Sequence, residues 1–172
     1  QIEREKSVIK AEIRGLTQRL AVRTGLQYSP DCPWRHAVWN GSTYVASIEC
    51  QLDLTGRIFA GTITALGADP TREFSDSASA QADGSYAEGF LTFTSGDNTN
   101  VTREVRAFVG KQFSLYFPFP YPVALVDAYS AVQGDDHHYL TCRDVLNNIV
   151  RFGGDPFLPG IDSVYSNPLQ GL

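Results

Sequence analysis

Residues 43–54, TYVASIECQLDL, determine the expected fold class because apolar and polar side chains alternate along them. The apolar side chains occupy every second position: Tyr44, Ala46, Ile48, Cys50, Leu52 and Leu54. Only Val45 departs from the pattern. Successive side chains of a β-strand point to opposite faces, so the alternation predicts one long strand with a dry face and a wet face.

Similar segments follow this stretch as far as residue 132, with turn residues between them. They lie at 57–66, 86–94, 101–109, 113–119 and 123–132, with a short edge strand near 72–74. Such regular spacing predicts an antiparallel meander sheet or barrel of about six strands over 43–132. Prolines at 118, 120 and 122 mark an edge, a bulge or an extended crossing, because proline cannot donate to a strand ladder.

Upstream, residues 1–24 are predicted to form a basic amphipathic helix. A stripe of apolar residues recurs at helical spacing: Ile2, Ile9, Ile13, Leu16 and Leu20. This segment carries six basic and three acidic residues, whereas the rest of the chain carries a net charge of −8. The acidic remainder argues against nucleic-acid binding. The basic helix favours a place on a partner subunit, or close to an anionic membrane.

Downstream, a short helix over 141–152 is predicted, since Thr141 is a reasonable N-cap and Gly153-Gly154 a stop. Residues 155–172 contain three prolines and scattered apolar side chains, which indicates an extended arm. Together these segments predict a single domain over 1–172, of the α+β class and mainly β.

The absence of methionine favours a processed protein or an excised fragment whose upstream part was a signal peptide or an anchor. We therefore expect an extracytoplasmic or secreted location, with possible anchoring through that upstream segment.

Two groups of residues offer chemistry. Asp135-Asp136-His137-His138 and Cys142 contain metal-ligand types, so a metal-dependent enzyme using His137, His138 and Cys142 is one hypothesis. The competing interpretation is a polar turn that leads into a helix. Cys32, Cys50 and Cys142 are spaced too widely for a zinc knuckle or a CxxC motif, and fit either one disulfide with a free thiol or three buried thiols.

Aromatic residues support a second hypothesis, a barrel that binds a small ligand. Its cavity would be lined by Trp34, Trp39, Phe113 and Phe117. Ordinary core packing accounts for the same residues without a ligand.

The leading hypothesis is a non-enzymatic structural or interaction module of an extracytoplasmic or multi-subunit assembly, with no cofactor. Its layout is similar to that of pilus or secretion-fibre subunits at the level of architecture only. Contacts with other subunits, or with copies of itself, are predicted at Ile9, Ile13, Leu16, Leu20, Phe157, Leu158 and Tyr165.

Overall fold

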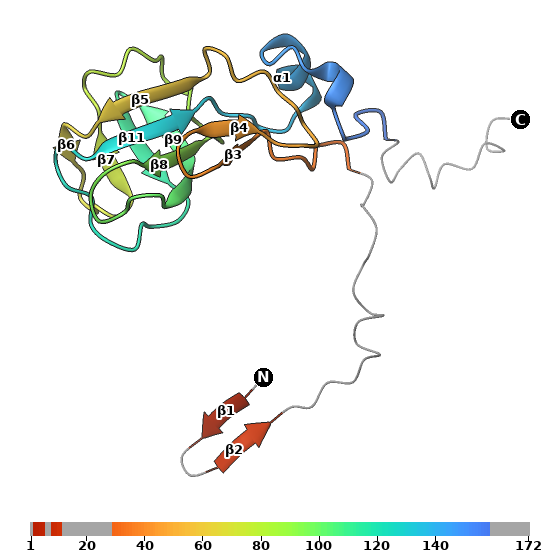
Figure 1. The fold of residues 1–172 in the computed structure, drawn as a ribbon. Helices are drawn as coiled ribbons and strands as arrows, with labels where there is room; N and C mark the ends of the chain where they lie inside the picture. Colours follow the sequence, from red (N-terminus) through yellow and green to blue (C-terminus); the bar gives the residue numbers. More distant parts are fainter. Residues whose placement is uncertain (1, 6–7, 12–28, 159–172) are drawn as a thin grey trace, which may run out of the picture.

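The computed structural model of the protein describes residues 2–5, 8–11 and 29–158, and this part of the chain is mainly β (Figure 1). Seven antiparallel strands form the main sheet in the order β5-β11-β8-β9-β10-β7-β6. Their bounds are β5 (Ile58–Thr62), β6 (Ala65–Leu66), β7 (Glu73–Ser75), β8 (Phe90–Phe93), β9 (Thr102–Val109), β10 (Gln112–Leu115) and β11 (Ala128–Val132).

The main sheet closes on itself because its two end strands are consecutive pieces of one segment. β5 and β6 are separated only by Ile63 and Thr64. The Ile63 amide donates to the carbonyl of Asp127 beside β11 (3.0 Å), and the Thr64 amide donates to the carbonyl of Ser75 on β7 (2.8 Å). Segment 58–66 therefore joins both edges of the sheet, and the result is a barrel with few free edges.

The strand order corrects the predicted meander. The strands β8, β9 and β10, and the pair β6 and β7, are neighbours both in sequence and in the sheet. In contrast, β11 inserts between β5 and β8, and β7 pairs with β10. Long connections, including residues 116–127, carry the chain across the barrel ends. Periodicity along a strand does not report such crossings, so the sequence pattern could not distinguish the two orders.

Aromatic rings fill the barrel. The fully buried set is Phe74, Tyr86, Phe93, Phe108, Phe113 and Tyr129. Phe108 and Phe113 have ring centroids 4.6 Å apart, and Tyr86 meets Phe108 edge to face at 4.7 Å. Such pairs add stabilisation beyond the area that they bury. One polar contact crosses this core, from the Tyr129 hydroxyl to the buried carboxylate of Asp76 (2.7 Å).

A small hairpin lies on the outside of the barrel. Its strands are β3 (Ala37–Trp39) and β4 (Tyr44–Ala46), which pair in antiparallel register. Ala37 and Tyr44 pack against Phe90 and Val132, and the Tyr44 hydroxyl lies 2.7 Å from the Thr92 hydroxyl. The hairpin is thereby fixed to the barrel wall.

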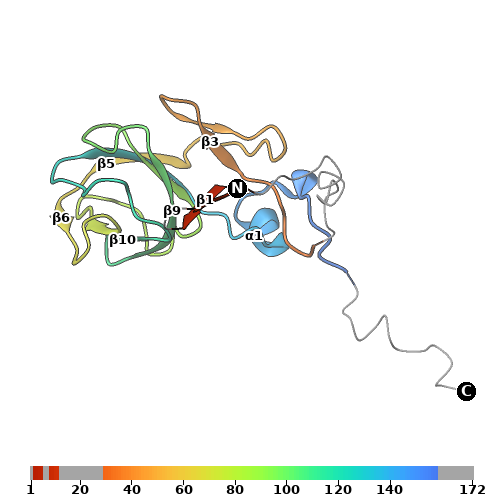
Figure 2. The ribbon, with the colours of Figure 1, turned by 90° about the horizontal axis from the view of Figure 1, so that it is seen from below.

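The C-terminal part of the described chain forms a lobe beside the barrel (Figure 2). It contains α1 (Tyr139–Asp144) and the 3₁₀ helix η2 (Ile149–Arg151). Arg57 links the lobe to the barrel, because its guanidinium donates to the carbonyls of Val145 (3.2 Å) and Leu146 (3.3 Å). The described segment 29–158 begins and ends at this lobe, where the Asp155 amide donates to the Ser29 carbonyl (2.8 Å). None of the helices in residues 29–158 is long and apolar enough to span a bilayer.

The predicted N-terminal helix is wrong. Residues 2–11 contain two antiparallel strands, β1 (Ile2–Glu5) and β2 (Val8–Ala11), with Ile2 opposite Ala11. The helical stripe depended on Ile13, Leu16 and Leu20, which lie outside the described residues. Within 2–11, β-branched residues and a two-residue connection suit a hairpin equally well.

The long strand predicted over 43–54 is a short strand followed by a turn at residues 48–50 and by irregular chain. Only Tyr44–Ala46 is a strand, and Ile48 is 85% exposed. Ser47 ends the strand because its hydroxyl accepts from the Cys50 amide (3.1 Å) and its carbonyl accepts from the Gln51 amide (2.9 Å). Side chains such as serine compete with strand ladders in this way. The helix predicted over 141–152 is likewise divided into α1 and η2.

We expect Tyr129→Phe to destabilise the protein by about 1–3 kcal/mol, because the substitution removes the hydroxyl that donates to buried Asp76. Chemical denaturation of the variant beside Tyr121→Phe, whose side chain is exposed, measures the difference. Equal unfolding free energies for the two variants would show that the Asp76 contact contributes nothing.

Candidate functional site

Three buried thiols gather at the junction between the barrel and the C-terminal lobe. We call Cys32, Cys50 and Cys142 the thiol cluster; all three are free and at most 8% exposed. They come from the entering segment, from the turn after β4 and from α1. Negative charge on Cys32 or Cys50 would raise the pKa of Cys142, so the three thiols lie within electrostatic range of one another.

Cys32 has the environment of an activated thiol. Burial opposes its ionisation, but hydrogen bonds from the His137 imidazole and from the Gly153 and Trp34 amides outweigh burial, so the pKa of Cys32 lies below its ordinary value. The same hydrogen bond raises the pKa of His137 against the effect of burial. The contact therefore shifts Cys32 toward its thiolate form and His137 toward its imidazolium form.

Backbone geometry holds this pair together. The Cys32 amide donates to the carbonyl of His137 (2.9 Å), and the Gly153 amide lies 3.4 Å from the Cys32 sulfur. His137 has a left-handed backbone (φ +63°), which is uncommon outside glycine and asparagine. A side chain at Gly153 would collide with the indole of Trp34, so glycine is required there.

The other two thiols are held neutral. Burial raises the pKa of Cys50, and burial with the nearby Asp135 raises the pKa of Cys142 to about 11. The Asn148 side chain donates to the Cys50 carbonyl (2.8 Å) and lies 3.3 Å from its sulfur. The cluster therefore combines one ionisable thiol with two that stay protonated at neutral pH.

A buried histidine borders the cluster. His36 is fully buried, with Nε2 2.9 Å from the Gln133 carbonyl, while its Nδ1 has no partner among the described residues. Burial lowers the pKa of His36 although the nearby Asp135 opposes this effect. A neutral imidazole, stacked on Phe90 at 5.4 Å, is the expected state.

The residues of the predicted metal site do not converge. His137 is directed at Cys32, whereas His138 places Nδ1 2.9 Å from a carboxylate oxygen of Asp31. Thiolates and imidazoles are suitable ligands for zinc. Nevertheless, across residues 29–158 no group of three or more His, Cys, Asp or Glu is placed to hold a metal ion.

The four aromatic residues of the predicted ligand cavity lie in four different environments. Phe113 is fully buried in the barrel core, and Phe117 is 67% exposed. Trp34 packs beside Cys50, and Trp39 donates from Nε1 to Asn100 (3.1 Å) on the outer surface. A ligand-binding barrel is therefore not supported.

Two of the predicted contact residues lie on the surface of the described part. Phe157 is 79% exposed and Leu158 is 36% exposed. Ile9 lies in β2, while Ile13, Leu16, Leu20 and Tyr165 are outside the described residues. Their role in contacts stays a prediction.

Phe157 lines a groove at the C-terminal lobe, which we call the α1 groove. Its lining comes from α1, from the residues just before it and from the segments around Pro30 and Pro156, and its volume is about 820 Å³. Apolar side chains dominate it: Pro30, Tyr139, Leu140, Pro156 and Phe157. Arg143, His138 and two aspartates form its polar rim.

Sequence reasoning did not locate the thiol cluster, although three buried thiols were one of its two alternatives. The three cysteines lie far apart along the chain, so their spacing does not indicate that the fold brings them together. A signal was available for Cys50 alone, since it precedes Leu52 on the predicted dry face.

Two comparisons with known proteins found similarities to this chain, one to a family of sequences and one to a solved structure. The family described as "Phage conserved hypothetical protein BR0599" matches residues 84–162, somewhat less than half of the chain. This match includes β8 to β11, α1 and most of the α1 groove.

A chain in the solved structure "Virion of native gene transfer agent (GTA) particle" has a similar fold, with a TM-score of 0.71 and 24% sequence identity. The similarity covers 100% of this chain and 58% of that chain. The protein thus spans well under two thirds of the chain that it resembles. No curated protein matches it.

We expect iodoacetamide to alkylate Cys32 before Cys142 as the pH is raised, because the thiolate is the nucleophile and the pKa of Cys32 is lowered. In His137→Asn, chosen because asparagine tolerates a left-handed backbone, the midpoint for Cys32 should move upward, because the hydrogen bond that lowers the pKa of Cys32 is removed. Peptide mass spectrometry after timed alkylation gives both curves. Prior reaction of Cys142, or an unchanged Cys32 curve in the variant, would contradict the lowering of the Cys32 pKa by His137.

Proposed function

We propose that this protein is a non-enzymatic structural subunit of a phage-like particle, built into it through contacts with other protein subunits. The family match over residues 84–162 carries the proposal, since that family is described as a conserved phage protein. The fold similarity to a chain of a gene transfer agent virion agrees with it over the whole length of the protein.

The construction of the body suits such a role. A closed barrel has few unpaired strand edges, so it can be present at high local concentration in an assembly without pairing edge to edge. Its interior is filled by aromatic rings rather than by a ligand cavity. Specific contacts are then left to the loops and to the lobe.

The proposed partners are thus subunits of a phage-like particle and not the pilus or secretion-fibre subunits of the sequence-based analogy. The proposal of a multi-subunit assembly is unchanged. The findings do not support membrane proximity through a basic helix. An extracytoplasmic location stays a prediction, and it is compatible with a subunit of a released particle.

Particles purified from cells that produce this protein should contain it at a fixed ratio to the other structural proteins. Quantitative mass spectrometry of gradient-purified particles measures that ratio. Deleting the gene should leave incomplete particles in electron micrographs, and supplying the full chain in trans should restore them.

A matched control separates a structural role from a catalytic one. Supplying Cys32→Ser should also restore complete particles, because the proposal assigns no reaction to the thiol cluster. Absence of the protein from complete particles, or normal particles after deletion, would refute the proposal.

A further inference from the structure

One edge of β5 is not covered by another strand. The barrel closes at Ile63 and Thr64, beyond the end of β5, so β5 itself pairs only with β11. Figure 1 shows β5 beside β11, with a loop and no strand on its other side. An edge of this kind presents N–H and C=O groups that an additional strand can pair with.

The direction of the ladder hydrogen bonds identifies the unpaired groups. The Ile63 amide donates to the carbonyl of Asp127, which lies opposite it beside β11 (3.0 Å). Bonded and non-bonded pairs alternate along an antiparallel ladder, so the even-numbered residues of β5 direct their backbone groups away from β11. These residues are Ile58, Ala60 and Thr62, and their outward groups have no backbone partner among residues 29–158.

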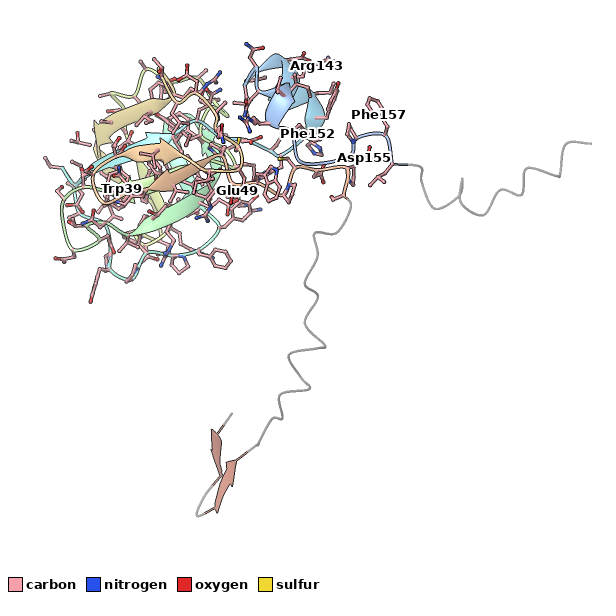
Figure 3. The ribbon with its side chains drawn as sticks, turned by 45° about the vertical axis from the view of Figure 1, so that its right-hand side comes forward. Trp39, Glu49, Arg143, Phe152, Asp155 and Phe157 are labelled. Atoms are coloured by element: carbon pink, nitrogen blue, oxygen red, sulfur yellow. The ribbon has the colours of Figure 1, made fainter. Side chains whose placement is uncertain are left out.

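A hollow lies along this edge, and we call it the β5 slot. It is lined by all five residues of β5, by residues 78–81 and by the buried residues Asp76 and Tyr86, and its volume is about 460 Å³. No residue of the lobe lines it, so the β5 slot is separate from the thiol cluster and the α1 groove. Figure 3 shows Arg143 and Phe157 on the lobe, away from the barrel.

The β5 slot contains a buried carboxylate without a cation. Asp76 is 2% exposed, and it accepts from the Tyr129 hydroxyl (2.7 Å) and from the Ala78 amide (2.9 Å). Within residues 29–158 the ion pairs involve other carboxylates, and no Lys, Arg or His lines the slot. Buried charges in proteins are normally paired, so a positive group that entered the slot would be stabilised there.

Gly61 leaves the approach to Asp76 open. A side chain at position 61 would collide with the Asp76 carboxylate and with the Tyr129 hydroxyl. On the free edge of β5, Gly61 occupies a non-hydrogen-bonded position, where the side chains of two paired strands lie closest. Residues directly opposite each other point to the same face, so the residue of an added strand opposite Gly61 would point toward Asp76.

We propose that the β5 slot binds an extended segment of another particle subunit, which adds to β5 as a strand and places a lysine or arginine opposite Gly61. Strand addition takes its affinity from main-chain hydrogen bonds and its specificity from alternate side chains. The unpaired edge requires an extended backbone, and Asp76 requires a basic side chain. The inference rests on the proposed function, because it names the kind of partner segment through which the protein joins the particle.

Two peptides test this contact on the isolated full chain. In antiparallel register, acetyl-STKTVTS-amide places its lysine opposite Gly61 and its valine opposite Phe59, whereas acetyl-STETVTS-amide carries glutamate in place of lysine. In titrations followed by NMR, the lysine peptide should shift the amide signals of Ala60 and Thr62. Its Kd should be lower than that of the glutamate peptide by about tenfold or more, because like charges placed together are disfavoured. Asp76→Asn should abolish that difference.

N-methylated peptides separate strand pairing from other modes of binding. The central threonine of the lysine peptide lies opposite Ala60, so its amide faces β5, whereas the amide of the valine faces away. A methyl group on the threonine amide should abolish binding. A methyl group on the valine amide is the matched control, and it should leave the Kd nearly unchanged.

The inference is overturned if the Ala60 and Thr62 signals do not respond at several mM peptide, if the two N-methylated peptides bind equally, or if lysine and glutamate peptides bind equally. Slow hydrogen exchange at these two amides in the isolated protein would also overturn it, because this chain or a second copy would then already occupy the edge. None of these results depends on whether the protein is present in purified particles, which tests the proposed function separately.

Discussion

The barrel depends on one short segment that belongs to both edges of its sheet. Residues 58–66 pair with β11 at their start and with β7 at their end, and Ile63 and Thr64 make the change of partner within two residues. Because the edges are thereby joined, the inward side chains of all strands face one enclosed space. Aromatic rings fill that space, so closure of the sheet and packing of the core are a single event.

Closure of the barrel also determines where the unusual ionisable side chains lie. A filled barrel offers no interior site, and the unusual ionisable groups collect at the junction with the lobe. There Cys32 and His36 of one segment meet His137, which is distant from them in sequence. Arg57 joins the two parts through carbonyls near the end of α1. Cys32 is bonded to the lobe at His137 and Gly153, so the environment of Cys32 reflects how the lobe packs on the barrel.

The mainly β character could be predicted because several of the expected segments do contain strands, as β9 within 101–109 and β11 within 123–132 show. The strand over 43–54 was overextended because Ser47 bonds the backbone locally, which a hydrophobic pattern does not register. The order of strands was missed because crossings lie in the connections. The same crossings bring the three cysteines together, so their spacing along the chain could not predict the thiol cluster.

The bond between Ser29 and Asp155 means that the described body begins and ends at one point. Such a unit needs only a narrow opening in a host chain, so it can be inserted into a loop of a larger protein without separating the flanking segments. The chain that it resembles is longer, and this protein corresponds to 58% of it. Because its two ends are adjacent, the body could be inserted into different host proteins, or circularly permuted at another loop, without a change to its core.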